Sequence, residues 1–172
     1  FVLEALLSLG LWWSVDVTSG AWQAAVDLPW IPQWGIHFSV GLDGIALTLV
    51  LLTTLLMPLV VLGSWTSIRT KVHSYYALLL MLTVGMLGVF VSLDLVLFYV
   101  MWEIMLVPMY LIIGVWGGER RLYASIKFFI YTMIGSLLML VAILYLGSEA
   151  SRVGGGPSFS YDFILQNVHL DL

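Results

Sequence analysis

Residues 95–116, LVLFYVMWEIMLVPMYLIIGVW, form a run of apolar side chains interrupted by a single charged residue. A helix of this length is about 33 Å long, and the hydrocarbon core of a bilayer is about 30 Å thick. Lipid offers no partner to backbone polar groups, and the run lacks the alternation of a barrel strand. The stretch therefore predicts a helix that crosses a membrane.

The same pattern recurs on both sides of this stretch, in residues 44–65, 75–93 and 122–147. The whole sequence is 62% apolar and only 9% charged, which is too few charges to cover the surface of a water-soluble domain of this size. We therefore expect an all-α integral membrane protein, a bundle of four complete transmembrane helices. The apolar residues 1–13 are too few to span a bilayer and predict the end of a truncated helix, so the chain is expected to be the N-terminal part of one membrane domain.

Two segments break the apolar pattern and predict loops outside the membrane. Residues 16–43 are rich in Trp, a residue that gathers at bilayer interfaces, and Ile36–Val40 alternates as one strand of a small β-hairpin does. Residues 148–172 contain the turn-forming run Gly154–Pro157 and are expected to be a second external loop.

The distribution of charge predicts the orientation. The connectors 66–74 and 117–121 hold four of the six basic residues, so they are expected on the cytoplasmic side. The opposite side then collects most of the acids, namely Asp16, Asp27, Asp43, Asp94, Glu149, Asp162 and Asp171.

Composition excludes several classes of function. The net charge is −4 and the basic residues are scattered, so no surface for nucleic acid is expected. With no cysteine, the chain cannot ligate an iron–sulfur cluster or a thiolate zinc ion. His37, His73 and His169 are far apart in the sequence, which argues against a local metal cluster. No cofactor or metal is therefore expected on this chain.

Four residues within or beside the spans are assigned structural roles. Asp43 and Asp94 precede two predicted helices and are expected to be their N-caps. Pro58 and Pro108 lie inside predicted helices, where each removes a backbone hydrogen bond and is expected to kink the helix. At Pro108 the carbonyl left without a partner is that of Ile104, beside Glu103.

Glu103 is the only acid within the four complete spans, about 12 Å from the outer end of its helix and near the membrane midplane. A carboxylate at that depth costs about 2.5–3.5 kcal/mol on insertion scales, so such residues commonly serve a function. Burial disfavours the anion and a nearby cation favours it, and a glutamate subject to both can exchange a proton. The alternative is a permanently protonated acid that holds helices together.

Lys127 is the second ionisable candidate, about 8 Å from the cytoplasmic end of its helix, where a lysine can also reach the interface. Glu103 lies about 12 Å deeper than Lys127, so a direct salt bridge is not expected. A relation through water is the better hypothesis, and it leaves Glu103 without a convincing countercharge in this sequence.

The chain resembles the antiporter-like subunits of proton-pumping NADH:quinone oxidoreductase, respiratory complex I, and among them those of the subunit M or mitochondrial chain 4 type. The resemblance covers nearly the whole chain. It rests on Trp102–Glu103, Val107–Tyr110 and Lys127–Thr132, and on the upstream segments Pro29–Pro32, Gly41–Gly44 and Gly63–Trp65.

The resemblance implies that Glu103 is the essential glutamate of a proton relay and that Lys127 is a basic position that tunes it. It also implies a place in the cytoplasmic membrane of a bacterium, beside other membrane-arm subunits. NADH, FMN, iron–sulfur clusters and quinone are expected in other subunits, with no redox chemistry on this chain. Two alternatives remain: a subunit of a multisubunit cation/proton antiporter or membrane-bound hydrogenase, and a non-conducting structural spacer.

Overall fold

The computed structural model describes residues 1–16, 19 and 21–168. His169 and Asp171 lie outside the described residues, as do three positions of the loop at 16–43. Along the chain the described elements are α1 (Val2–Ser14), β1 (Gln23–Ile31), a 3-10 turn (Pro32–Trp34), β2 (Ile36–Leu42), α2 (Gly44–Ser64), α3 (Val72–Val91), α4 (Leu95–Trp116), α5 (Arg121–Gly154) and α6 (Tyr161–Asn167).

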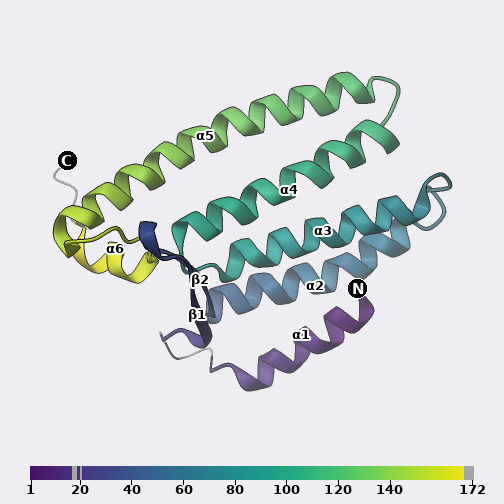
Figure 1. Cartoon of the computed structure of the whole chain (residues 1–172). Helices are drawn as coiled ribbons and strands as arrows, with labels where there is room; N and C mark the ends of the chain where they lie inside the picture. The colour runs from purple at the N-terminus through teal and green to yellow at the C-terminus, as the bar shows by residue number, and fades with distance from the viewer. Residues whose placement is uncertain (17–18, 20, 169–172) are drawn as a thin grey trace.

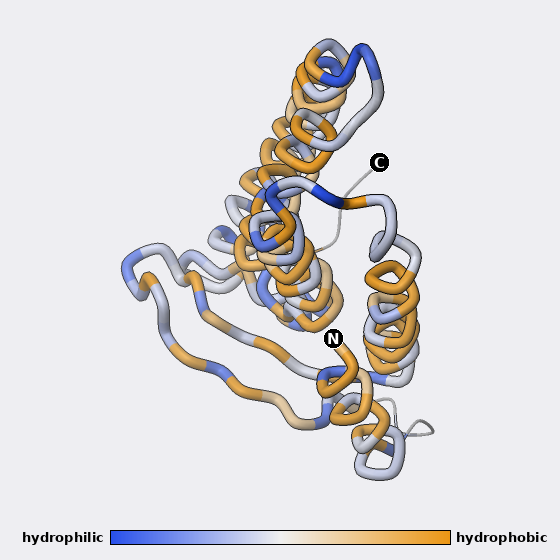
Figure 2. The backbone as a smooth tube through the Cα atoms, turned by 90° about the vertical axis from the view of Figure 1, so that its right-hand side faces the viewer, coloured by the Kyte–Doolittle hydropathy of each residue, from blue (hydrophilic) through white to orange (hydrophobic). Residues whose placement is uncertain are grey.

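Helices α2 to α5 lie side by side in sequence order, with α1 against α2 and with the two strands and α6 at one end of the bundle (Figure 1). Each of the four is long and apolar enough to cross a membrane, which confirms the predicted spans. Figure 2 shows that hydrophobic residues predominate along the helices. Many large apolar side chains point outward, as they do in a protein that is surrounded by lipid.

Both predicted N-caps are confirmed. The Asp43 carboxylate accepts a hydrogen bond from the Ala46 amide at 2.7 Å, and Asp94 accepts from the amides of Val96 at 2.9 Å and Leu97 at 3.1 Å. These bonds satisfy backbone donors that have no partner within their own helix. They begin α2 and α4 on the side of the bundle where the hairpin lies.

Pro58 and Pro108 lie inside α2 and α4, and neither proline interrupts its helix. Each ring still lacks an N–H, so the carbonyls of Thr54 and Ile104 lose their usual helical donors. Pro108 is fully buried. The hydroxyl of Thr54, which is also buried, lies 2.6 Å from that of Ser8 on α1 and joins these two helices.

The predicted hairpin is confirmed, with β1 antiparallel to β2 and Asp27 opposite Ser39. The alternation of residues 36–40 predicted strand β2, whereas strand β1 was not predicted, because Pro29 and weak alternation conceal it. The hairpin is attached to the bundle by the connector between α3 and α4, where the Leu93 amide donates to the Ser39 carbonyl at 2.8 Å.

The prediction of a loop from residue 148 onward was wrong in part. Helix α5 continues to Gly154, and α6 forms a further short helix within the same segment. The drop in hydropathy after residue 147 marks the expected edge of the lipid, whereas the helix itself ends where Gly155 adopts a left-handed conformation. At Gly147 and Gly154 a Cβ would collide with the rings of Phe159 and Phe163, so these glycines allow the segment to fold back onto α5.

The turn of the hairpin yields a stability prediction. Gly35 has φ +62°, and a Cβ there would lie 1.9 Å from the Pro157 carbonyl oxygen, a backbone atom. We expect Gly35→Ala to lower the free energy of unfolding by about 2 kcal/mol or more, since the left-handed conformation alone costs about 1–2 kcal/mol. The measurement is the thermal stability of the detergent-solubilised protein.

The matched control is Gly118→Ala, because a Cβ at that connector glycine meets no atom within 4 Å and no left-handed φ is involved. We expect this variant to unfold like the wild type. Equal stability of the two variants would contradict the packing of the hairpin against residues 157–158.

Candidate functional site

The Glu103 side chain is half-buried, and its Oε1 atom is fully buried. This oxygen is the one buried side-chain nitrogen or oxygen without a hydrogen-bond partner among the described residues. An unpaired buried carboxyl oxygen is costly and calls for an explanation. Glu103 lies about 12 Å from the start of α4, at a depth where lipid would surround the bundle.

Helix α4 presents this side chain toward α5. Tyr110 is two turns from Glu103 on the same face, and its ring lies 5.5 Å from that of Phe129 on α5. Gly114, one further turn along this face, approaches Ser125 of α5. Because residues seven and eleven positions apart share a helix face, Glu103 lies on the α5-facing side of α4.

The opposite face of α4 packs tightly on α3. A Cβ at Gly85 would lie 2.5 Å from Met105, and one at Gly88 would lie 2.6 Å from Met101. Met101 is two residues from Glu103 and therefore about 200° away around the helix. Close packing of the two methionines on glycines fixes the rotation of α4 and so the direction of the carboxyl.

Tyr99, one turn before Glu103, is the site residue that sequence reasoning missed. The pairs Tyr110–Phe129 and Gly114–Ser125 set the register of α4 against α5, and this register places Ser136 of α5 opposite Glu103, one turn from Tyr99. Ser136 is 4% exposed and donates to the Met133 carbonyl at 3.0 Å. The four-residue spacing between Tyr99 and Glu103 was the available signal, but only the packing of α5 brings in Ser136.

The structure does not bring Lys127 to Glu103. Lys127 is exposed, its Nζ lies 5.7 Å from the centre of the Tyr123 ring, and no ion pair joins it to Glu103 in the described part of the chain. Ser125 faces α4, and two residues along a helix turn through about 200°, so Lys127 lies on the far face of α5. There it borders a groove of about 400 Å³ with apolar and tyrosine side chains.

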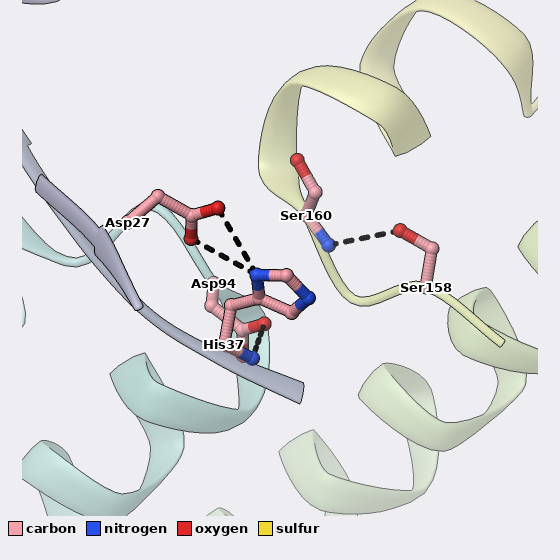
Figure 3. A network of polar contacts seen from close by, with 5 residues as sticks. All are labelled: Asp27, His37, Asp94, Ser158 and Ser160. Atoms are coloured by element: carbon pink, nitrogen blue, oxygen red, sulfur yellow. Dashed lines mark hydrogen bonds and ion pairs between the residues drawn. The ribbon is translucent and has the colours of Figure 1, made fainter. Parts of the chain in front are cut away.

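A second group of polar residues lies at the end of the bundle, where the hairpin meets the start of α4. The His37 ring Nδ1 is 3.1 Å from both carboxylate oxygens of Asp27, and the His37 amide donates to Asp94 at 3.1 Å (Figure 3). With Ser158 and Ser160 they border a small polar pocket of about 200 Å³. Across the residues that the structure describes, no three His, Cys, Asp or Glu side chains are placed to hold a metal ion.

The bundle and its buried carboxyl thus define a class, a polytopic membrane protein with an ionisable group inside its helices. Residues 92–154 match the family described as "NADH:quinone oxidoreductase/Mrp antiporter, TM". "NADH-quinone oxidoreductase subunit M" of Rhodobacter capsulatus is 44% identical over 99% of this chain and 32% of its own length. "F(420)H(2) dehydrogenase subunit M" of Methanosarcina mazei is 39% identical over 91% of this chain and 32% of its own length.

A solved structure has the same fold. A chain of "Respiratory complex I from Thermus thermophilus with bound NADH" superposes with a TM-score of 0.81 at 30% identity, over 98% of this chain and 33% of that one. Residues 92–154 thus match the NADH:quinone oxidoreductase/Mrp antiporter family, and most of the chain is similar to relatives of the subunit M, or chain 4, type. It spans about a third of the length of the relatives it matches.

Proposed function

We propose that this chain is part of a proton-translocating membrane-arm subunit of an NADH:quinone oxidoreductase, in which Glu103 binds and releases protons. The single observation that carries the proposal is the Glu103 Oε1 atom, fully buried and unpaired on the α5-facing side of α4. A carboxyl held in low dielectric without a fixed partner can take up a proton and lose it again when a nearby group changes. An acid with a purely structural role would be expected to have its hydrogen bonds satisfied.

In this proposal the redox chemistry takes place on other subunits. The sequence contains no cysteine, so this chain has no thiolate to ligate an iron–sulfur cluster. Its own contribution is to hold a proton at the Glu103 carboxyl and to exclude lipid and bulk water around it. The partners are other membrane-arm subunits, including neighbouring antiporter-like subunits.

We place the protein in the cytoplasmic membrane of a bacterium. The basic connectors at 66–74 and 117–121 would lie on the cytoplasmic side, and the hairpin and the segment after residue 147 on the outer side. The relatives from Rhodobacter capsulatus and Escherichia coli support a bacterial source.

The test is deletion of the gene in the native host, followed by complementation with the wild-type gene. In inside-out membrane vesicles, proton uptake is measured with NADH as donor, and sodium/proton exchange is measured under an imposed gradient. We expect deletion to remove NADH-driven proton uptake by the quinone-reducing enzyme, complementation to restore it, and exchange to remain. Loss of exchange with unchanged NADH-driven uptake would contradict the proposal and favour the cation/proton antiporter.

We also propose a secondary role for Lys127. It lies on the face of α5 that points away from Glu103, so it would act on the carboxyl indirectly, through groups that pack against that face. Lys127→Met is expected to lower the number of protons pumped per NADH about two- to fivefold without abolishing pumping, since the lysine has no direct contact with Glu103. Stability should change by no more than about 1 kcal/mol, the value of a surface cation–π contact.

The control is Lys127→Arg, which keeps the charge and is expected to pump nearly as the wild type does. Proton-to-NADH ratios and melting temperatures of the two variants decide the matter. Unchanged pumping in Lys127→Met would remove Lys127 from the relay.

A further inference from the structure

The hydroxyl of Tyr99 is the nearest polar group on α4 that shares a face with Glu103. The two residues are four positions apart, so their side chains lie one above the other on the helix. Tyr99 is half-buried, and its ring packs beside a buried apolar cluster of Ile36, Ile143 and Phe159. The ring is thus fixed by apolar contacts, whereas its O–H bond remains free to rotate.

Two acceptors compete for that single phenol proton. One is the Glu103 carboxyl, one turn along the same face of α4. The other is the Ser136 hydroxyl on α5, which the register of the pairs Tyr110–Phe129 and Gly114–Ser125 places opposite Glu103. Ser136 donates its own proton to the Met133 carbonyl at 3.0 Å, which leaves the lone pairs of its oxygen available. Glu103 Oε1 is buried and has no hydrogen-bond partner, so this oxygen is open to a donor.

The protonation state of Glu103 decides which acceptor is better. An ionised carboxylate only accepts hydrogen bonds and attracts a donor more strongly than a neutral hydroxyl does. A protonated carboxyl has an O–H of its own, which donates to the phenol oxygen and leaves the phenol proton for Ser136. One rotation about the phenol C–O bond converts the first arrangement into the second.

We propose that Tyr99 is a positioning residue for Glu103, whose hydroxyl donates to the carboxylate when Glu103 is ionised and to Ser136 when Glu103 is protonated. This inference rests on the proposed function only in that Glu103 changes protonation state. The phenol then keeps the carboxyl directed toward α5 in both states, and it connects the charge on α4 to a buried hydroxyl on the next helix.

The test compares single-atom deletions in the protein expressed from its native gene. Tyr99→Phe removes only the hydroxyl and keeps the ring that packs beside Ile143. Ser136→Ala removes the second acceptor and serves if Tyr99→Phe does not assemble. The matched control is Tyr110→Phe, which removes a hydroxyl on the same face of α4 from a ring that contacts Phe129.

Infrared difference spectra report the carbonyl stretch of protonated Glu103, assigned as the band that is lost in Glu103→Gln. We expect this band to move to higher wavenumber in Tyr99→Phe, because a carboxyl that loses a hydrogen bond has a stiffer C=O bond. A smaller shift is expected in Ser136→Ala and none in Tyr110→Phe. Protons pumped per NADH should fall about two- to fivefold in Tyr99→Phe, because the carboxyl is less well positioned.

An unshifted band and wild-type pumping in both Tyr99→Phe and Ser136→Ala, with both signals lost in Glu103→Gln, would overturn the role of Tyr99 and leave the proposed function intact. Conversely, the proposed contact would be supported and the relay refuted if the band shifts in Tyr99→Phe while Glu103→Gln pumps as many protons as the wild type. A shift as large in Tyr110→Phe would also overturn the inference, because any change on this face would then have the same effect.

Discussion

A Glu103→Gln variant is expected to oxidise NADH and fold as the wild type does, yet to pump at least about tenfold fewer protons per NADH, since proton transfer by a positioned acid is worth about two to four orders of magnitude. Glutamine has nearly the shape of glutamate but binds no proton at the position of Oε1. Its neutral amide also avoids the cost of a carboxylate in lipid. The free energy of unfolding should therefore stay equal or rise.

The measurements are proton uptake and NADH oxidation in the same inside-out vesicles, and the melting temperature of the solubilised protein. The control is Glu119→Gln, which removes an exposed glutamate in the connector between α4 and α5 and should leave coupling unchanged. A Glu103→Gln variant that pumps like the wild type would show that Glu103 only holds helices together and that this part of the chain is a structural spacer.

Replacement of Asp94 by alanine is expected to give the largest loss of stability of the variants considered. Asp94 is 2% exposed, and its carboxylate accepts from the amides of Val96, Leu97 and His37. Each buried donor that loses its acceptor costs about 1–3 kcal/mol, and the three losses overlap. We expect the free energy of unfolding to fall by about 3–4 kcal/mol, a range set by those overlapping costs.

Two variants dissect this loss. Asp43→Ala removes an N-cap with a single bond to Ala46 and should cost about 1 kcal/mol. Asp94→Asn keeps one oxygen for the α4 amides but places an NH₂ group toward either these amides or His37. Its loss of stability should lie between those of Asp43→Ala and Asp94→Ala. Thermal unfolding in detergent gives the ranking, and an Asp94→Ala variant no less stable than Asp43→Ala would show that Asp94 does not hold the hairpin to α4.

Asp94 also connects stability to the candidate site. It begins α4 nine residues before Glu103, and it ties that end of the helix to β2 through the His37 amide (Figure 3). The neighbouring backbone pairs Leu95 with Phe159, and Tyr161 with Leu93, so the segment after α5 is held at the same point. Loss of this junction should therefore disturb the position of Glu103 as well as the hairpin.

The four spans were predictable because a helix of about 20 apolar residues matches the thickness of the hydrocarbon core of a bilayer. The caps at Asp43 and Asp94 were predictable because a side-chain oxygen just before an apolar run satisfies local backbone donors. Strand β1 was missed, and the extension of α5 beyond residue 147 was missed as well. The extension of α5 depends on the segment that follows it, such as the packing of Phe159 on Gly147, whereas β1 is concealed by Pro29 and weak alternation and forms by pairing with β2.

The sequence by itself determined that this chain has helices able to cross a membrane and that Glu103 lies near the middle of one of them, because both depend only on composition and on the rise of a helix. Tertiary structure alone decided the direction in which that acid points. Methionines of α4 pack on Gly85 and Gly88 of α3, which turns the Glu103 face toward α5 and Ser136, while Lys127 falls on the opposite face of α5. The rotation of one helix against another is set by side-chain packing between them. The sequence pattern of a single helix therefore does not predict it.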